Sequence, residues 1–165
     1  MKATLTGNKR RLKELARRHG TPLMTISRSA LRGQLERFRR VLPRVEPFFA
    51  IKANAHPEVL KTMVAGRAGF DVASAAEMSQ VLAAGAKPDG IIFANTIKPA
   101  DAIALAARKG VTLMTFDSGY ELDKIAQHAP GVASQAPPNR APNHLMISSL
   151  SFATVVIPPA MTRAT

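Results

Sequence analysis

The chain has 165 residues, of which 46% are apolar, and a formal net charge of +12. That apolar fraction is ordinary for a globular chain, so the composition predicts a packed core. The sequence contains no stretch long and apolar enough for a transmembrane helix and no signal-peptide core, and we expect a cytoplasmic protein. Without a cysteine, the composition says nothing about the redox compartment.

Most of the basic excess lies in two segments, residues 9–18 and 28–40. Both predict amphipathic helices with solvated basic faces, and in the second Leu31, Leu35 and Phe38 recur at helical spacing. Such charge invites a nucleic-acid interpretation. Because no recognised binding motif accompanies the charge, and the chain has one tyrosine and no tryptophan, we expect no nucleic-acid partner and no membrane partner.

Residues 47–54, Pro-Phe-Phe-Ala-Ile-Lys-Ala-Asn, form a short apolar run that ends on a lysine. The pattern predicts a buried strand on which Phe48, Ala50 and Lys52 share one face. Burial there would disfavour the charged form of the Lys52 amine, and a neutral amine can attack a carbonyl carbon to form a Schiff base. The alternative is a strand-end lysine that reaches solvent.

Three further apolar runs follow at intervals of about 20 residues, and each of the four is followed by a segment with helical periodicity. The predicted later strands cover residues 69–74, 91–95 and 111–118. The predicted helices cover residues 57–65, 75–84, 99–109 and 119–128. Alternating β and α units of this length predict a parallel sheet or a (β/α)8 barrel.

Residues that favour helix ends flank these segments. Pro57 and Pro99 suit first helical turns, where a missing N–H costs little. Ser74 and Ser118 are predicted N-caps, and Glu77, three residues after Ser74, completes a capping box. Helix C-termini favour a left-handed residue, and a glycine stands at three such places: Gly66, Gly85 and Gly110.

The expected fold class is therefore α/β, a partial (β/α)8 TIM-type barrel of about the first four βα units, with an irregular C-terminal tail. In a barrel, functional residues gather at the carboxyl ends of the strands. Lys52, Asp71, Asn95 and Asp117 all fall at or near such ends.

Four groups of residues follow one another in order: 21–23 (Thr-Pro-Leu), 47–54 around Lys52, 69–74 with Glu77, and 92–98 together with 115–118. In this order and spacing, from about Thr21 to Gly131, the chain resembles the N-terminal part of the pyridoxal-phosphate-dependent ornithine/lysine decarboxylases, which share the alanine-racemase-type barrel. The resemblance implies a carboxy-lyase that converts ornithine or lysine to a diamine in polyamine biosynthesis. It leaves the choice between the two substrates open.

The resemblance also implies pyridoxal 5′-phosphate (PLP) as the cofactor, with Lys52 as the lysine that holds it in a Schiff base. Asp71 would be a second catalytic residue beside that Schiff base, and Glu77 would belong to the same cofactor-binding cluster. A carboxylate near an iminium stabilises the protonated form. The alternatives are that Asp71 only pairs with a neighbouring cation and that Glu77 only caps its helix.

The composition changes after Gly131, because residues 132–165 contain five prolines and no Asp, Glu or Lys. We expect a basic helical segment at 1–20, the N-terminal half of a PLP-binding barrel at 21–131, and a disordered or out-of-frame tail at 132–165. Such a chain, truncated or frameshifted near Gly131, would lack the phosphate loop and second half of the family's site. We expect little or no activity from it alone. The alternative function is a catalytically silent homologue that binds a full-length subunit of the homodimeric parent family.

Overall fold

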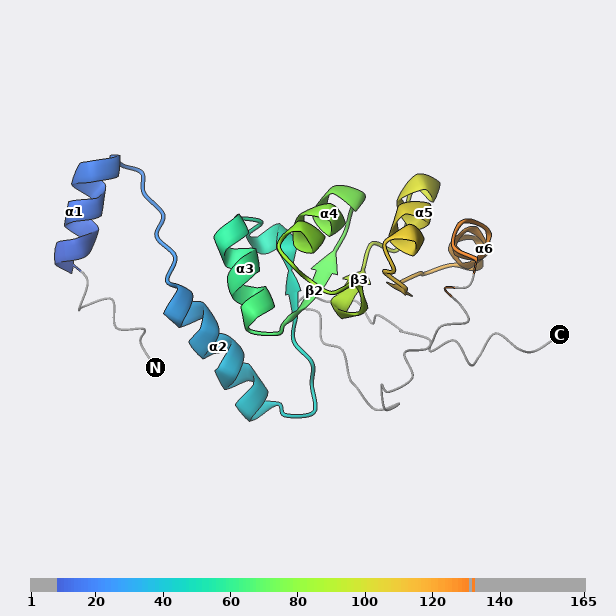
Figure 1. Ribbon diagram of the computed structural model, residues 1–165, viewed down its shortest axis with the longest axis horizontal. Coiled ribbons are helices and arrows are strands. Elements are labelled where there is room, and N and C mark those ends of the chain that lie inside the picture. Colours follow the sequence, from blue (N-terminus) through green and yellow to red (C-terminus); the bar gives the residue numbers. More distant parts are fainter. Residues whose placement is uncertain (1–8, 131, 133–165) are drawn as a thin grey trace.

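The computed structural model describes residues 9–130 and residue 132, and it forms an α/β fold (Figure 1). The N-terminal helices are α1 (Lys9–His19) and α2 (Arg28–Val41). The strands and 3₁₀ turns are β1 (Phe48–Ala50), η2 (Ile51–Ala53), β2 (Gly69–Val72), η3 (Pro88–Gly90), β3 (Ile91–Phe93) and β4 (Leu113–Met114). The later helices are α3 (Pro57–Ala65), α4 (Ala75–Ala83), α5 (Ala100–Arg108) and α6 (Gly119–His128).

The four strands form one parallel sheet in the order β1-β2-β3-β4. In its register Ala50 pairs with Asp71, Asp71 with Ile92, and Ile92 with Leu113. Each strand is followed by one of the helices α3 to α6, which confirms the four predicted βα units of a partial barrel. Of the predicted tail, only Val132 is described, and it packs against the core, while residues 133–165 lie outside the described residues.

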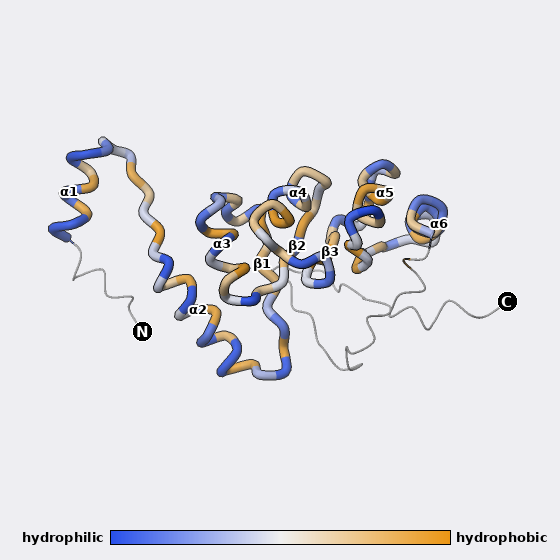
Figure 2. Tube along the Cα trace, in the orientation of Figure 1, coloured by the Kyte–Doolittle hydropathy of each residue, from blue (hydrophilic) through white to orange (hydrophobic). Residues whose placement is uncertain are grey.

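Helices α3 to α6 stand in a row along one side of the sheet (Figure 1). Phe70, Val72 and Phe93 are buried in the core between the sheet and these helices. Because side chains alternate along a strand, Asp71 and Ile92 point to the opposite face. Apolar residues dominate the strands, whereas the helix α1 is largely hydrophilic (Figure 2).

The predicted first strand is too long. β1 ends at Ala50, and the backbone N–H of Asn54 donates to the carbonyl of Ile51 at 3.0 Å, which closes the turn η2. Lys52 therefore does not share a strand face with Phe48 and Ala50. The fourth predicted strand also shrinks, to Leu113–Met114.

The predicted helix ends are mostly confirmed. Pro57 occupies the first turn of α3, while Pro99 is the N-cap of α5 rather than part of it. The φ angles of Gly85 and Gly110 are +96° and +77°, in the left-handed region as expected.

The prediction for Gly66 is wrong, because its φ is −78° and the left-handed residue is Arg67, at +57°. Gly66 is instead the C-cap of α3, and α2 packs closely against it. A Cβ at Gly66 would lie 2.5 Å from a methyl carbon of Leu35, so a larger residue there would require the Leu35 side chain to shift. The Arg39 guanidinium then donates to the carbonyls of Gly66 and Arg67, at 2.6 and 2.7 Å.

Candidate active site

Lys52 lies in the turn η2, immediately after the carboxyl end of β1. Ile51, its neighbour, is 1% exposed and anchors the turn in the core, whereas Lys52 is exposed. The predicted burial of the amine is therefore wrong for the described structure, and the alternative of a strand-end lysine that reaches solvent describes its surroundings. Its position at a strand end agrees with the sequence analysis.

Asp71 lies on β2, between Ala50 of β1 and Ile92 of β3, on the sheet face away from the helices. The side chain is half-buried. Burial raises the pKa of its carboxyl group, the positive charge of Lys52 opposes that rise, and the negative charge of Glu77 adds to it. Lys52 and Asp71 thus interact electrostatically across neighbouring strands.

Glu77 lies in the first turn of α4, and its role as a helix cap is clear. Its backbone N–H donates to Ser74 Oγ at 3.2 Å, and its carboxylate accepts from the Ala73 N–H at 2.7 Å. This is the predicted capping box, with the carboxylate reaching one residue further back than the N-cap. Because Glu77 also acts on the charge of Asp71, it belongs electrostatically to the same cluster.

The structure therefore brings Lys52, Asp71 and Glu77 together at the carboxyl ends of the first two strands. Asn95 and Asp117, also expected near strand ends, are both exposed beyond β3 and β4. Asn95 Oδ1 accepts from the backbone N–H of Ile97 at 3.4 Å, so it supports its own loop.

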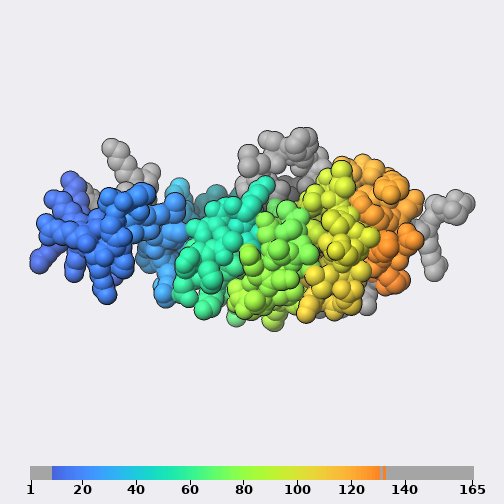
Figure 3. Space-filling model, turned by 90° about the horizontal axis from the view of Figure 1, so that it is seen from above, coloured from blue at the N-terminus to red at the C-terminus, as the bar shows by residue number. Residues whose placement is uncertain are grey.

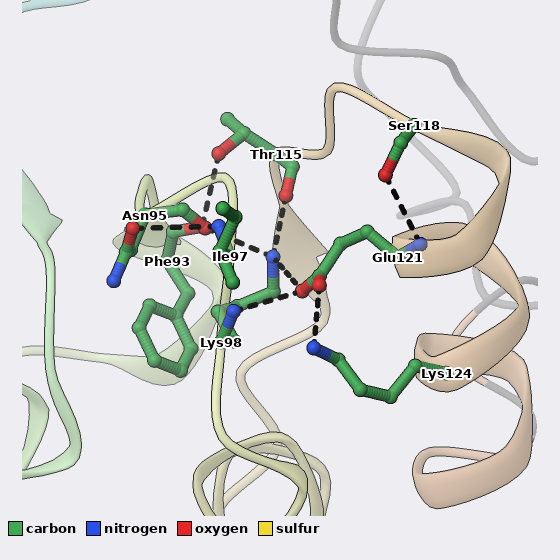
Figure 4. Close-up of polar contacts among 8 residues, drawn as sticks. All are labelled: Phe93, Asn95, Ile97, Lys98, Thr115, Ser118, Glu121 and Lys124. Carbon is green, nitrogen blue, oxygen red and sulfur yellow. Dashed lines mark hydrogen bonds and ion pairs between the residues drawn. The ribbon is translucent and has the colours of Figure 1, made fainter.

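Beyond the carboxyl ends of β3 and β4 the structure contains a buried charge cluster to which the sequence analysis assigned no role (Figure 4). The Lys98 ammonium group has no exposed surface and lies 3.0 Å from Glu121 Oε1. It also donates to the carbonyls of Asn95 and Thr115, at 2.9 and 2.6 Å. The other oxygen of Glu121 pairs with Lys124 Nζ at 2.6 Å.

The charges in this cluster compensate one another. Burial would raise the pKa of Glu121, but hydrogen bonds from Lys124 and Lys98 outweigh it and hold that pKa below its ordinary value. Burial lowers the pKa of Lys98, and the contact with Glu121 opposes that shift. The sequence does contain a capping-box pattern at Glu121, which follows the N-cap Ser118 by three residues, and its backbone N–H donates to Ser118 Oγ. Its carboxylate, however, binds Lys98, which lies 23 positions away in the sequence.

The amine and carboxylate at the ends of β1 and β2 suit a carbonyl cofactor, since one can form an imine and the other can stabilise the positive charge on it. Among residues 9–130 and 132, no group of His, Asp or Glu side chains has the arrangement of a metal site. No described helix is long and apolar enough to cross a membrane.

The chain is similar to known proteins in sequence and in fold. Residues 28–146 match the family model of the pyridoxal-dependent decarboxylases, for their pyridoxal binding domain. The match extends past Gly131, beyond the boundary expected from composition. An ornithine decarboxylase of Schizosaccharomyces pombe is 46% identical over 97 residues, which cover 59% of this chain and 22% of that protein.

Two further proteins are similar. Antizyme inhibitor 2 of Xenopus laevis is 44% identical over 94 residues, covering 57% of this chain and 21% of its own length. The crystal structure of lysine decarboxylase from Selenomonas ruminantium superposes with a TM-score of 0.71 at 37% identity, covering 74% of this chain and 32% of that one. The chain thus spans about a fifth to a third of the proteins that it matches. From its matched residues and its fold, it belongs to the family of pyridoxal-dependent decarboxylases.

Proposed function

We propose that the chain carries the lysine-bearing part of a PLP-dependent decarboxylase that converts ornithine or lysine to a diamine in polyamine biosynthesis. The observation that carries the proposal is the placement of Lys52 and Asp71 at the ends of adjacent parallel strands, where their charges interact. The family match extends over both residues. The name of the yeast relative gives ornithine and that of the bacterial structure gives lysine, so the proposal keeps both substrates.

In this proposal each residue of the cluster has one task. Lys52 Nζ would hold PLP covalently and would carry a proton to or from the substrate carbon. The Asp71 carboxylate would stabilise positive charge on Lys52 Nζ, and Glu77 fixes the start of α4 beside it. PLP, when bound, supplies the electron sink for the bond that releases carbon dioxide.

The activity of a whole decarboxylase requires more of the barrel than the described residues supply. A complete (β/α)8 barrel has eight strands, and the described residues supply four. We therefore expect little or no carbon dioxide release from the 165-residue chain alone, and we propose that a homodimer with a cytoplasmic location is the form of the parent enzyme. Robust turnover by the purified chain would contradict this expectation.

Borohydride trapping tests the role of Lys52. The purified chain is mixed with PLP and reduced, and the modified lysine is identified by peptide mass spectrometry. We expect the adduct at Lys52, and not at Lys61, an exposed lysine on α3 that serves as the matched control. In the Asp71→Asn variant we expect slower labelling of Lys52. Equal labelling of Lys52 and Lys61 would show non-specific chemistry and refute the assignment.

A second function is favoured by one specific observation. Antizyme inhibitor 2, a similar protein, has the name of an inhibitor rather than of an enzyme. On this alternative, the chain acts by binding a full-length decarboxylase subunit. Co-purification of the tagged chain with such a subunit, unchanged by the Lys52→Ala substitution, would favour binding over catalysis.

A further inference from the structure

A pocket of about 330 Å³ lies at the amino ends of the first two strands. Its walls are residues 43–47, in the loop that joins α2 to β1, together with Arg39 at the end of α2 and Arg67 in the turn that joins α3 to β2. Lys52 follows the carboxyl end of β1, at the other end of the same strand. The proposed cofactor chemistry therefore does not use this pocket.

The walls of the pocket belong to segments that already contact one another. The view from above shows α2 packed against α3 (Figure 3), where Leu35 closely approaches Gly66. The backbone N–H of Gly69 donates to the carbonyl of Pro47 at 3.0 Å and joins the two loops below the sheet. The pocket is thus formed within the described fold and away from the edge of the sheet at β4.

The guanidinium group of Arg39 is held in place at the pocket wall. It donates to the carbonyls of Gly66 and Arg67, at 2.6 and 2.7 Å. A guanidinium group carries five N–H donors in a fixed planar arrangement, so these two bonds orient the group and leave its other donors for a ligand.

Arg67 lines the pocket from a backbone conformation that few residues with a side chain adopt. Its φ is +57°, in the left-handed region. The two bonds from Arg39 end on the carbonyls of Gly66 and Arg67 itself, so they support this conformation. A residue held in such a conformation is a recurrent feature of ligand sites.

The pocket has an excess of positive charge. Three arginines line it, Arg39, Arg44 and Arg67, against one carboxylate, Glu46. Within the described residues, none of the three guanidinium groups forms an ion pair with a carboxylate. The ligand that matches this wall carries at least two negative charges, and guanidinium groups bind phosphate oxygens in pairs.

We propose that this pocket binds a small molecule that carries a diphosphate group. Arg44 and Arg67 donate to the phosphate oxygens from the two walls, and the remaining donors of Arg39 complete the site. Because Arg44 precedes β1 and Arg67 precedes β2, the bound molecule joins the starts of the two strands. The site is separate from Lys52 and does not depend on the proposed decarboxylase function.

Isothermal titration calorimetry of the full 165-residue chain with inorganic pyrophosphate tests the proposal. The titration is done at about 0.15 M salt, where interactions between distant exposed charges are largely screened. We expect one pyrophosphate to bind each chain. Orthophosphate should bind at least about tenfold more weakly, because it offers fewer oxygens to the three guanidinium groups.

Two single variants remove one guanidinium group each. Arg44→Gln and Arg67→Gly should each weaken pyrophosphate binding about tenfold. Glycine adopts a positive φ readily, so Arg67→Gly removes the charge and keeps the turn. The matched controls are Arg17→Gln on α1 and Arg108→Gln at the end of α5, both at exposed arginines outside the pocket, and both should bind as the parent does.

Three results would overturn the proposal. The first is the absence of saturable pyrophosphate binding. The second is an equal loss of affinity in the pocket variants and the two controls, because the anion would then respond only to the general positive charge of the chain. The third is loss of binding in Lys52→Ala, which would place the anion at the cofactor site instead.

Discussion

The buried ammonium group of Lys98 holds oxygen atoms from three segments of the chain. It binds the carbonyl that follows β3, the carbonyl that follows β4, and the carboxylate of Glu121 in α6. The ring of Phe93 lies 5.8 Å from the same nitrogen. One side chain thus donates to two carbonyls and one carboxylate from three segments, and it offsets the cost of burying them.

Replacement of Lys98 by Met should lower the free energy of unfolding by about 3–5 kcal/mol, because the buried carboxylate loses one of its two cationic partners and two carbonyls lose their donor, while Lys124 and the backbone N–H of residue 98 still bind the carboxylate. Urea denaturation measures this change. The double variant Lys98→Met, Glu121→Leu should recover part of the loss, since it removes both buried charges. A Lys98→Met variant as stable as the parent would show that the pair contributes little.

The raised pKa of Asp71 has a consequence for stability. The folded state holds the proton of this carboxyl more tightly than the unfolded state, so the group weakens the fold as pH rises through its raised pKa. Asn carries no charge at any pH, and Asp71→Asn should therefore be more stable than the parent at neutral pH. The difference should shrink as pH falls towards the ordinary carboxyl value of 3.8.

Thermal unfolding over a pH series measures this difference, and Asp89→Asn, at an exposed carboxyl, is the matched control. A variant at Asp71 that is less stable than the parent at neutral pH would mean that attraction to Lys52 outweighs the burial of the carboxyl group.

Helix α4 begins at a cap that can be tested in isolation. Ser74→Ala removes the oxygen that accepts from the Glu77 N–H and should lower the free energy of unfolding by about 1 kcal/mol. Ser79→Ala, in the same helix, removes only an exposed bond to the carbonyl of Ala75 and should have a smaller effect. Equal losses from the two substitutions would argue against a specific role for the cap.

Elements with local signals could be predicted from the sequence. The bounds of α3 and α6 were predicted to the residue, because Pro57 and Ser118 mark their starts and Gly66 follows the end of α3. β1 could not be bounded in this way, because the turn η2 continues its apolar pattern through Ile51.

Features that depend on contacts between distant segments could not be predicted. The close packing of Leu35 in α2 against Gly66 is one such feature, because no local pattern near residue 66 reports α2. The pairing of Lys98 with Glu121 could not be predicted either, because it joins residues of two βα units that are 23 positions apart in the sequence. For the candidate site, the sequence predicted the strand ends of Lys52 and Asp71 but not the exposure of Lys52.

As a whole, the sheet formed by the described residues ends at β4, which among those residues pairs with β3 only. Open edges favour association. We expect the average mass of the chain in light scattering to rise with concentration above its 17.7 kDa. The substitution Leu113→Lys places a charge at the β4 edge and should reduce this rise in mass with concentration. The substitution Gln80→Lys, at an exposed position of α4, should not. A constant mass of one chain would show that this edge is covered.

One amide in the molecule has an unusual acceptor. The backbone N–H of Lys98 donates to the side-chain carboxylate of Glu121 at 3.0 Å, and not to a carbonyl of the sheet or of a helix. Its exchange with deuterium is consequently governed by the docking of α6 and not by fraying of β3. A single resolved signal in a hydrogen-exchange spectrum would therefore report how often the third and fourth βα units separate.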